Sequence, residues 1–170
     1  MPAFVALLRA VNVGGTGKLP MTELKSMCER AGFTEVQTYI ASGNVVFNSS
    51  VSAAQVKALL EKSLQAYAGK AVAVMVRSAP EMAQVLHNNP FPDGAPNRVV
   101  AIFLDQAPSA DLIDKITGRV DEQVALGQRE VYVHYGDGMA DSKLKLPGAA
   151  IGTARNMNTV AKLAALAAQR

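Results

Sequence analysis

A chain of 170 residues that is 49% hydrophobic and 18% charged is globular rather than disordered, and it is long enough for one buried core or two small subdomains. Its formal net charge is +3, and its longest uncharged run, residues 36–56, is too rich in Asn, Gln and hydroxyl side chains to cross a bilayer. The single cysteine, Cys28, excludes an internal disulfide, and because no signal-like segment is found we expect a cytoplasmic protein.

The first half of the chain predicts the element order βαββαβ. A helix opens at Pro20, and Gly32 stops it. Ser42-Gly43 separates two β-rich runs and predicts a hairpin, while Ser52 and Gln55 form a capping box for a second helix that closes at Gly69. The expected strands are residues 4–11, 34–41, 44–49 and 71–77, the expected helices are residues 20–31 and 52–69, and the expected buried face of the second helix is Val56, Leu59, Leu60 and Leu64.

This order defines an α+β fold with a ferredoxin-like first subdomain, residues 1–79. We expect one antiparallel four-stranded sheet with both helices on the same face. The apolar spacing of the first helix places Cys28 in the core, so the thiol is expected to be inert.

The second half, residues 80–170, predicts a smaller α+β subdomain. Ser78 and Glu81 form a capping box for a helix that ends before Asn88, and a Pro-, Gly- and Asn-rich loop follows. Further expected elements are a strand over residues 98–104, a helix from Ser109 to about Gly118, and strands over residues 123–127 and 130–135. The last expected element is a helix over residues 156–169 that packs back on the first subdomain.

Charge is distributed unevenly along the chain. Residues 1–79 hold eight basic and four acidic side chains, residues 80–140 hold four and nine, and residues 141–170 hold five and one. Three explanations are open: the basic tail docks against the acidic middle, the charged segments are solvated surface, or a basic surface binds a phosphate-bearing ligand.

The stretch RAVNVGGTGKLP, residues 9–20, lies where nucleotide-binding proteins carry phosphate loops. A Walker A loop needs glycine and a hydroxyl residue where this chain has Asn12 and Leu19, and a Rossmann loop needs glycine where it has Pro20. A glycine-rich turn with one lysine, Lys18, is left, and it is either a flexible connection or part of an anion site.

Other motifs are weaker. Asn44 and Val46 occupy the positions where an RNA-recognition domain needs aromatic side chains, and His87, His134 and Cys28 lie in three different elements. We therefore expect no metal site. The sequence names no cofactor and no catalytic set, so it does not decide whether the protein is an enzyme.

The stretch TARNMNTVAK, residues 153–162, predicts a helix start beside Arg155. The free N–H groups of that start, with Asn158, Thr159 and Lys162 following on one side, suit an anion. The alternative is an Asn156 cap with Arg155 tied to an acidic neighbour. The opposite, core-facing stripe is Met157, Val160, Ala164 and Ala167.

The run ALLRAVNVGGTGKLPMTELKSMCERAGFTEVQTYIASGNVVF and the later GTARNMNT together resemble a bacterial family catalogued as domain of unknown function 1697. In that family the pattern usually reads LLRGINVGG, then YI-x-SGNVVF, then RNW-x-T. Ala10 stands here for the usual glycine and Met157 for the usual tryptophan. The resemblance implies an α+β fold of two subdomains, the first ferredoxin-like, and no established activity.

Three functional hypotheses follow. The first is a binding module whose site lies at a cleft between the subdomains and takes a phosphate-bearing small molecule or a nucleic-acid backbone. The second is an enzyme acting on a phosphorylated substrate, with Ser42 or Asp141 at that surface. The third is structural: Arg9 and the polar groups of residues 42–44 and 155–158 only lock the two halves together. Arg9 shares its strand side with Val5 and Leu7, so we expect a buried charge that needs a partner. The candidate ligand-binding residues are Arg9, Asn12, Gly14, Gly15, Lys18, Ser42, Gly43, Asn44, Arg155, Asn156 and Asn158.

Overall fold

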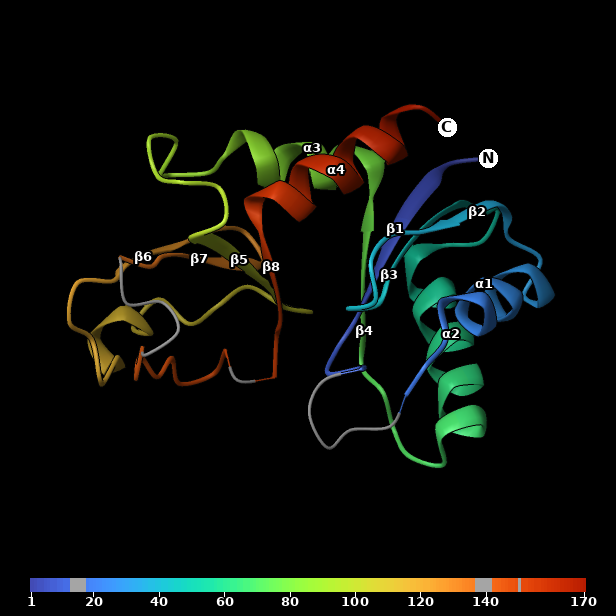
Figure 1. The fold of residues 1–170 in the computed structure, drawn as a ribbon, viewed down its shortest axis with the longest axis horizontal. Helices are drawn as coiled ribbons and strands as arrows, with labels where there is room; N and C mark the ends of the chain where they lie inside the picture. Colours follow the sequence, from blue (N-terminus) through green and yellow to red (C-terminus); the bar gives the residue numbers. More distant parts are fainter. Residues whose placement is uncertain (13–17, 137–141, 150) are drawn as a thin grey trace. The chain divides into compact units, whose positions relative to one another are not determined.

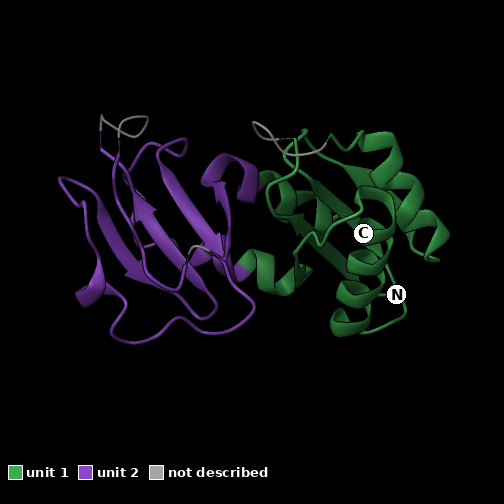
Figure 2. Ribbon diagram, turned by 90° about the horizontal axis from the view of Figure 1, so that it is seen from below, with its two compact units in different colours: residues 1–83, 162–170 green, residues 84–161 purple. Residues whose placement is uncertain are grey.

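A computed structural model describes residues 1–12, 18–136, 142–149 and 151–170 of the chain (Figure 1). The chain divides into two compact units, and each contains one four-stranded antiparallel sheet (Figure 2). Unit 1 comprises residues 1–83 and 162–170, and unit 2 comprises residues 84–161. None of the helices in the described ranges is both long and apolar enough to span a membrane.

Unit 1 has the expected βαββαβ order. Its elements are β1 (Ala3–Leu8), α1 (Met21–Arg30), β2 (Thr34–Thr38), β3 (Asn44–Asn48), α2 (Ala53–Ala68) and β4 (Val74–Ser78). The strand order β2-β3-β1-β4 places β1 in the middle of the sheet, where it pairs antiparallel with both β3 and β4. The predicted α+β class and antiparallel sheet are therefore confirmed.

The core of unit 1 lies between this sheet and its two helices. Helices α1 and α2 cover the same face of the sheet (Figure 1). Alternate residues of β1, Phe4, Ala6 and Leu8, belong to one core cluster with apolar residues of these helices. The Phe33 and Phe47 rings stack with their centroids 4.4 Å apart. Apolar periodicity thus dictates the layer arrangement, because each helix buries its apolar stripe against the same face of the sheet.

Both predicted capping boxes are present. At α2, Ser52 Oγ accepts the Gln55 N–H at 3.2 Å while the Gln55 side chain accepts the Ser52 N–H at 3.1 Å. Gly69 ends this helix with a φ of +72°, a left-handed conformation that glycine adopts at little cost. The prediction that Leu59 belongs to the buried face of α2 is wrong. Leu59 is 38% exposed, whereas Val56, Leu60 and Leu64 are buried.

The burial of Cys28 leads to the first prediction. Its side chain is fully buried on α1, and this burial, with a smaller contribution from the Glu29 charge, raises the pKa of the thiol to about 12. Because the thiolate is the reactive form, we expect a thiol reagent to label the native protein very slowly and the urea-unfolded protein quickly. Rapid labelling without denaturant, followed by absorbance, would contradict this burial.

Strand β2 is irregular and is contacted by the C-terminal residue. Its register with β3 shifts between Thr34 and Gln37, and Glu35 has a positive φ of 49°. The guanidinium of Arg170 donates to the Glu35 carbonyl from Nε at 3.0 Å and from Nη2 at 2.9 Å, and to the Leu166 carbonyl from Nη1 at 2.8 Å. The Glu35 carbonyl, which lies at the bulge, therefore has an intramolecular hydrogen-bond partner, Arg170.

Unit 2 is built on a second sheet with the strand order β6-β7-β5-β8. Its strands are β5 (Val99–Phe103), β6 (Gln123–Leu126), β7 (Glu130–His134) and β8 (Thr153–Asn156), with a 3-10 turn η1 (Ile113–Lys115). Helices α3 (Ala79–His87) and α4 (Met157–Ala168) each continue from one unit into the other. The expected stripe Met157, Val160, Ala164 and Ala167 is buried.

One face of this sheet is covered by chain with little regular structure. Val100 and Ile102 of β5 and Val131 and Val133 of β7 form a core with residues from segments 104–116 and 144–149. Tyr132 points the other way, and its hydroxyl donates to the Val85 carbonyl of α3 at 2.8 Å. Side chains on both faces of this sheet are therefore buried.

The prediction of a helix from Ser109 to about Gly118 is wrong, because the only helical element described there is the short η1. The chain becomes extended at Ile116, with φ −66° and ψ 137°, and Thr117 pairs with Lys145 through two backbone hydrogen bonds of 3.2 and 2.8 Å. This pairing competes with helix continuation. The β-branched residues Ile113, Ile116 and Thr117 also weaken a helix, so the strand-like pairing prevails.

Strand β8 was not predicted, and its composition explains why. It reads TARN and pairs with β5 over the register from Val100 with Asn156 to Phe103 with Thr153. Thr153 and Arg155 are the buried residues of this strand, so its inward positions are polar. Without hydrophobic alternation the strand is not visible in the sequence.

Glu122 is a buried acid that organises the loop before β6. Its Oε2 accepts the Ser142 hydroxyl at 2.6 Å, and its Oε1 accepts the Val120 and Asp121 N–H groups at 2.9 and 3.0 Å. These hydrogen bonds, the Ser142 one first, lower the pKa of the carboxyl to about 2. Glu122 therefore joins two segments that lie twenty residues apart in sequence.

Candidate functional site

Three loops of unit 1 meet at one end of its sheet. Leu8 of β1 pairs with Val74 of β4, and Leu7 pairs with Asn44 of β3. The end of β1 therefore lies beside the start of β4 and the start of β3. As a result, the chain after β1, the β2–β3 hairpin and the α2–β4 connection come together, although they are far apart in sequence.

Asn12 ties two of these loops together. Its Nδ2 donates to the Leu19 carbonyl at 2.9 Å and to the Ala41 carbonyl at 2.8 Å, while its Oδ1 accepts the Leu19 N–H at 2.7 Å. The side chain therefore holds residues 12 and 19 together and links both to the hairpin. A ligand-binding role for Asn12 stays a prediction, but its amide already has structural partners.

The hairpin residues Ser42, Gly43 and Asn44 are packed tightly. The buried Asn44 donates through Nδ2 to the Tyr39 carbonyl and to Ser42 Oγ, both at 2.9 Å. Gly43 has a φ of +91°, and a Cβ there would lie 2.6 Å from Val11 Cγ2. An amide cannot remove a proton from a hydroxyl, so the Asn44 contact does not activate Ser42 as a nucleophile.

Backbone strain is concentrated at this end of the sheet. Ala10, Asn12 and Ile40 have φ values of 56°, 55° and 51°. Residues other than glycine rarely adopt this region of backbone conformation. They are three of the four such residues in the described part of the chain. Strained backbone of this kind gathers at ligand sites, because the surrounding structure must hold it in place.

The strain at Ala10 gives a second prediction. Since glycine adopts positive φ freely, we expect Ala10→Gly to raise the free energy of unfolding by about 0.5 kcal/mol, even though glycine costs more chain entropy. Urea denaturation measures this change. The control is Ala31→Gly, at an ordinary φ of −76°, where the same substitution should destabilise by about 0.5–1 kcal/mol. A loss of stability in both variants would contradict the assignment of strain.

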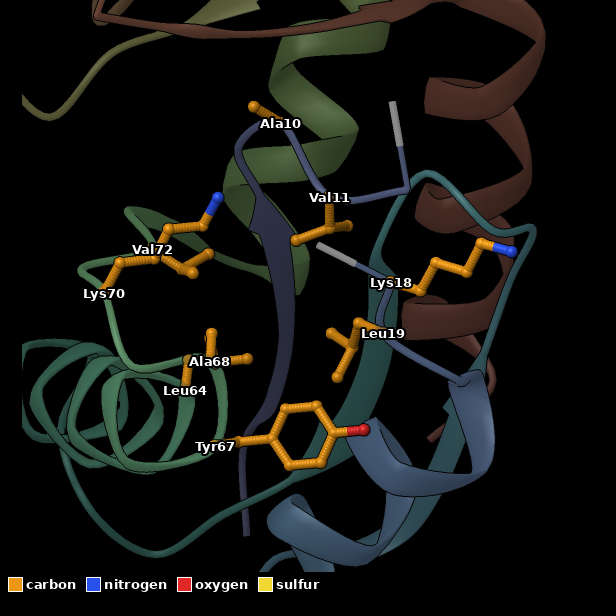
Figure 3. A pocket seen from close by; sticks show the side chains of 9 residues that line it. All are labelled: Ala10, Val11, Lys18, Leu19, Leu64, Tyr67, Ala68, Lys70 and Val72. Carbon is orange, nitrogen blue, oxygen red and sulfur yellow. The ribbon is translucent and has the colours of Figure 1, made fainter. Parts of the chain in front are cut away.

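A pocket of about 290 Å³ opens at this end of unit 1. It lies between the chain on either side of the glycine-rich stretch and the C-terminal end of α2 (Figure 3). Its walls are mainly apolar, as is typical of small-molecule sites. The lining residues are Ala10, Val11, Lys18, Leu19, Leu64, Tyr67, Ala68, Lys70 and Val72.

The charge of this pocket is positive. Among its nine lining residues, all of them in the described ranges, two are lysines and none is acidic. Figure 3 shows the Lys70 ammonium extending toward the end of β1 where Ala10 lies, whereas the Lys18 ammonium points away from Lys70 on the opposite side. The Tyr67 ring lies at the side of the pocket opposite Ala10, with its hydroxyl directed toward α1. An apolar pocket with cations at its sides suits an amphipathic anion.

The prediction that Arg9 is a buried charge is wrong. It is exposed and lies beyond the end of β1, because Ala10 turns the chain away from the sheet. The buried arginine of unit 1 is instead Arg77 of β4, which is 1% exposed and donates to the Val76 carbonyl at 3.1 Å. Gly14, Gly15 and Asp141 lie outside the described residues.

The C-terminal candidates lie at the junction of β8 and α4. Arg155 is buried and donates through Nη1 to the Ala154 carbonyl at 2.8 Å, and burial lowers the pKa of its guanidinium to about 10. Asn156 Oδ1 accepts the Thr159 N–H at 3.0 Å and so caps α4, while Asn158 is exposed. That Arg155 joins the unit 1 loops at one cleft stays a prediction.

The described ranges hold no group of three or more His, Cys, Asp or Glu side chains that could bind a metal ion. Of the predicted site residues that the structure describes, only Lys18 lines the pocket. Sequence reasoning missed Tyr67 and Lys70, which follow from topology: in the order β2-β3-β1-β4 the α2–β4 connection must lie next to the chain that leaves β1.

The fold and this pocket define a two-unit α+β protein. The pocket, at one end of the sheet of unit 1, has mainly apolar walls and two lysines. The model of the family described as protein of unknown function (DUF1697) matches residues 1–132, so the chain belongs to this family. No curated protein matches it. Among solved structures, the chain is similar in fold to a conserved bacterial protein, SP0830, from Streptococcus pneumoniae, with a TM-score of 0.80, 23% identity and 98% of each chain covered.

Proposed function

We propose that this protein binds a small molecule carrying an anionic group in the pocket of unit 1. One observation carries the proposal. The pocket of about 290 Å³ is mainly apolar, and its lining in the described chain includes two lysines and no acidic residue. Strained backbone at Ala10, one of the lining residues, adds support, because such strain is retained where a fixed surface is needed.

Lys70 is the principal anion-binding residue in this proposal. Its ammonium extends along the pocket toward Ala10, whereas that of Lys18 points away (Figure 3). Neither ammonium has an ion-pair or hydrogen-bond partner among the described residues. An anion entering the pocket therefore does not have to displace an internal carboxylate from Lys70.

The third prediction tests this site by titration calorimetry at low salt. The probes are phenyl phosphate, glycerol phosphate and ribose 5-phosphate. We expect at least one of them to bind the intact protein, and Lys70→Ala to weaken that binding by about tenfold, which corresponds to about 1.4 kcal/mol. Lys18→Ala is expected to have a smaller effect, and raising the salt concentration should weaken binding because the charges are screened.

Two control variants separate the pocket from general surface charge. Lys62→Ala removes an exposed lysine of α2 that does not line the pocket, and it should leave binding unchanged. Ala68→Leu fills the pocket from an exposed position on α2 without changing charge, and it should abolish binding. Absence of binding by every probe, or equal losses in Lys62→Ala and Lys70→Ala, would contradict the proposal.

A further inference from the structure

The polar groups of the pocket are few. Side-chain hydrogen bonding from the lining residues is limited to the ammonium groups of Lys18 and Lys70 and the hydroxyl of Tyr67. The Lys18 ammonium points outward, and the Tyr67 hydroxyl is directed toward α1 (Figure 3). The remaining lining side chains are hydrocarbon: Ala10, Val11, Leu19, Leu64, Ala68 and Val72.

This lining discriminates between ligands that share the same anionic group. A sugar hydroxyl or a nucleobase amide that packs against these hydrocarbon side chains gives up hydrogen bonds to water and gains none from them in return. A methylene chain or an aryl ring gains favourable burial at the same place. The hydrocarbon side chains of Leu64 and Val72 therefore select against hydroxyl-rich ligands.

Size is a second feature of the pocket. Its volume of about 290 Å³ is close to the lower end of the range of roughly 300–1,000 Å³ that is typical of small-molecule sites. The pocket therefore suits a compact ligand, with its anionic group at the Lys70 side.

We infer that the ligand of this pocket is a compact anion with a hydrocarbon body, a short alkyl chain or a single aryl ring, rather than a sugar phosphate or a nucleotide. This inference rests on the proposed function, because it names the ligand class of the same site. The Tyr67 ring and the Leu64 side chain contact the body, and Lys70 pairs with the anionic group.

Titration calorimetry with phosphate esters of similar size tests the inference. We expect phenyl phosphate and butyl phosphate to bind at least tenfold more tightly than glycerol phosphate and inorganic phosphate. Equal affinities for phenyl phosphate and glycerol phosphate would overturn the inferred class and leave the binding function intact. Absence of binding by all four anions would overturn both.

A variant with an altered pocket wall gives an independent readout. Val72→Thr keeps the shape of the wall and adds a hydroxyl, so the preference for butyl phosphate over glycerol phosphate should fall at least threefold. Val51→Thr makes the same chemical change in unit 1 outside the pocket and should leave the preference unchanged. An unchanged preference in Val72→Thr, with the variant folded by circular dichroism, would also overturn the inference.

Discussion

Gly43→Ala is expected to be among the most destabilising single substitutions in unit 1. A Cβ at this position would lie 2.6 Å from Val11 Cγ2 and 2.9 Å from Leu8 Cβ, and the φ of +91° is unfavourable for alanine. Overpacking and backbone strain together predict a loss of about 3 kcal/mol in the free energy of unfolding. Urea denaturation followed by circular dichroism measures this loss.

Gly32→Ala is the matched control for this prediction. Gly32 also has a φ of +91°, but nothing lies within 4 Å of a Cβ built there. It therefore reports the backbone strain alone, which we expect to cost about 1 kcal/mol. The difference between the two variants isolates the contact with Val11 and Leu8, and equal losses would show that the hairpin yields to the added methyl group.

Removal of the Glu122 carboxylate is the second large effect that we expect, this time in unit 2. Glu122→Ala leaves the N–H groups of Val120 and Asp121 and the hydroxyl of Ser142 without their common acceptor. Because these groups would lose a charged partner, the thermal midpoint at pH 7 should fall by about 4 °C or more. Differential scanning calorimetry checks this result.

The same carboxylate predicts a pH dependence with a definite sign. Its pKa is lowered from 4.5 to about 2 in the folded protein, so the ionised form stabilises the fold above pH 4.5 and this contribution is lost as the pH falls toward 2. Glu122→Gln cannot ionise and should lose stability less steeply than the wild type over this range. Glu29→Gln, at an exposed position on α1, should keep the wild-type slope. Parallel slopes for all three proteins would contradict the role of Glu122.

The fold was largely predictable because its signals are local. Capping boxes at Ser52 and Ser78, the hairpin at Ser42-Gly43 and the apolar spacing in α1 each define an element within a few residues. Two features were not predicted, because they have no local signal in the sequence. The Thr117–Lys145 pairing and the polar strand β8 depend on partners that lie many residues away.

The candidate site was less predictable. The glycine-rich stretch and its Lys18 stood out by composition, but Tyr67, Ala68 and Lys70 look like an ordinary helix end in the sequence. Their relation to Lys18 arises only when β1 pairs with β4. Conversely, the polar residues that stood out, Asn12 and Asn44, have backbone partners that account for their polarity.

The contact between Arg170 and the Glu35 carbonyl has a consequence for association between molecules. Strand β2 ends its sheet and pairs only with β3, and an unpaired strand edge is a template on which a strand of another chain can add. Here the bulge at Glu35 breaks the straight run of the edge, and the positively charged guanidinium occupies the carbonyl that a foreign N–H would need. Arg170 thereby hinders intermolecular β-pairing at the β2 edge, and with it the aggregation that such pairing starts.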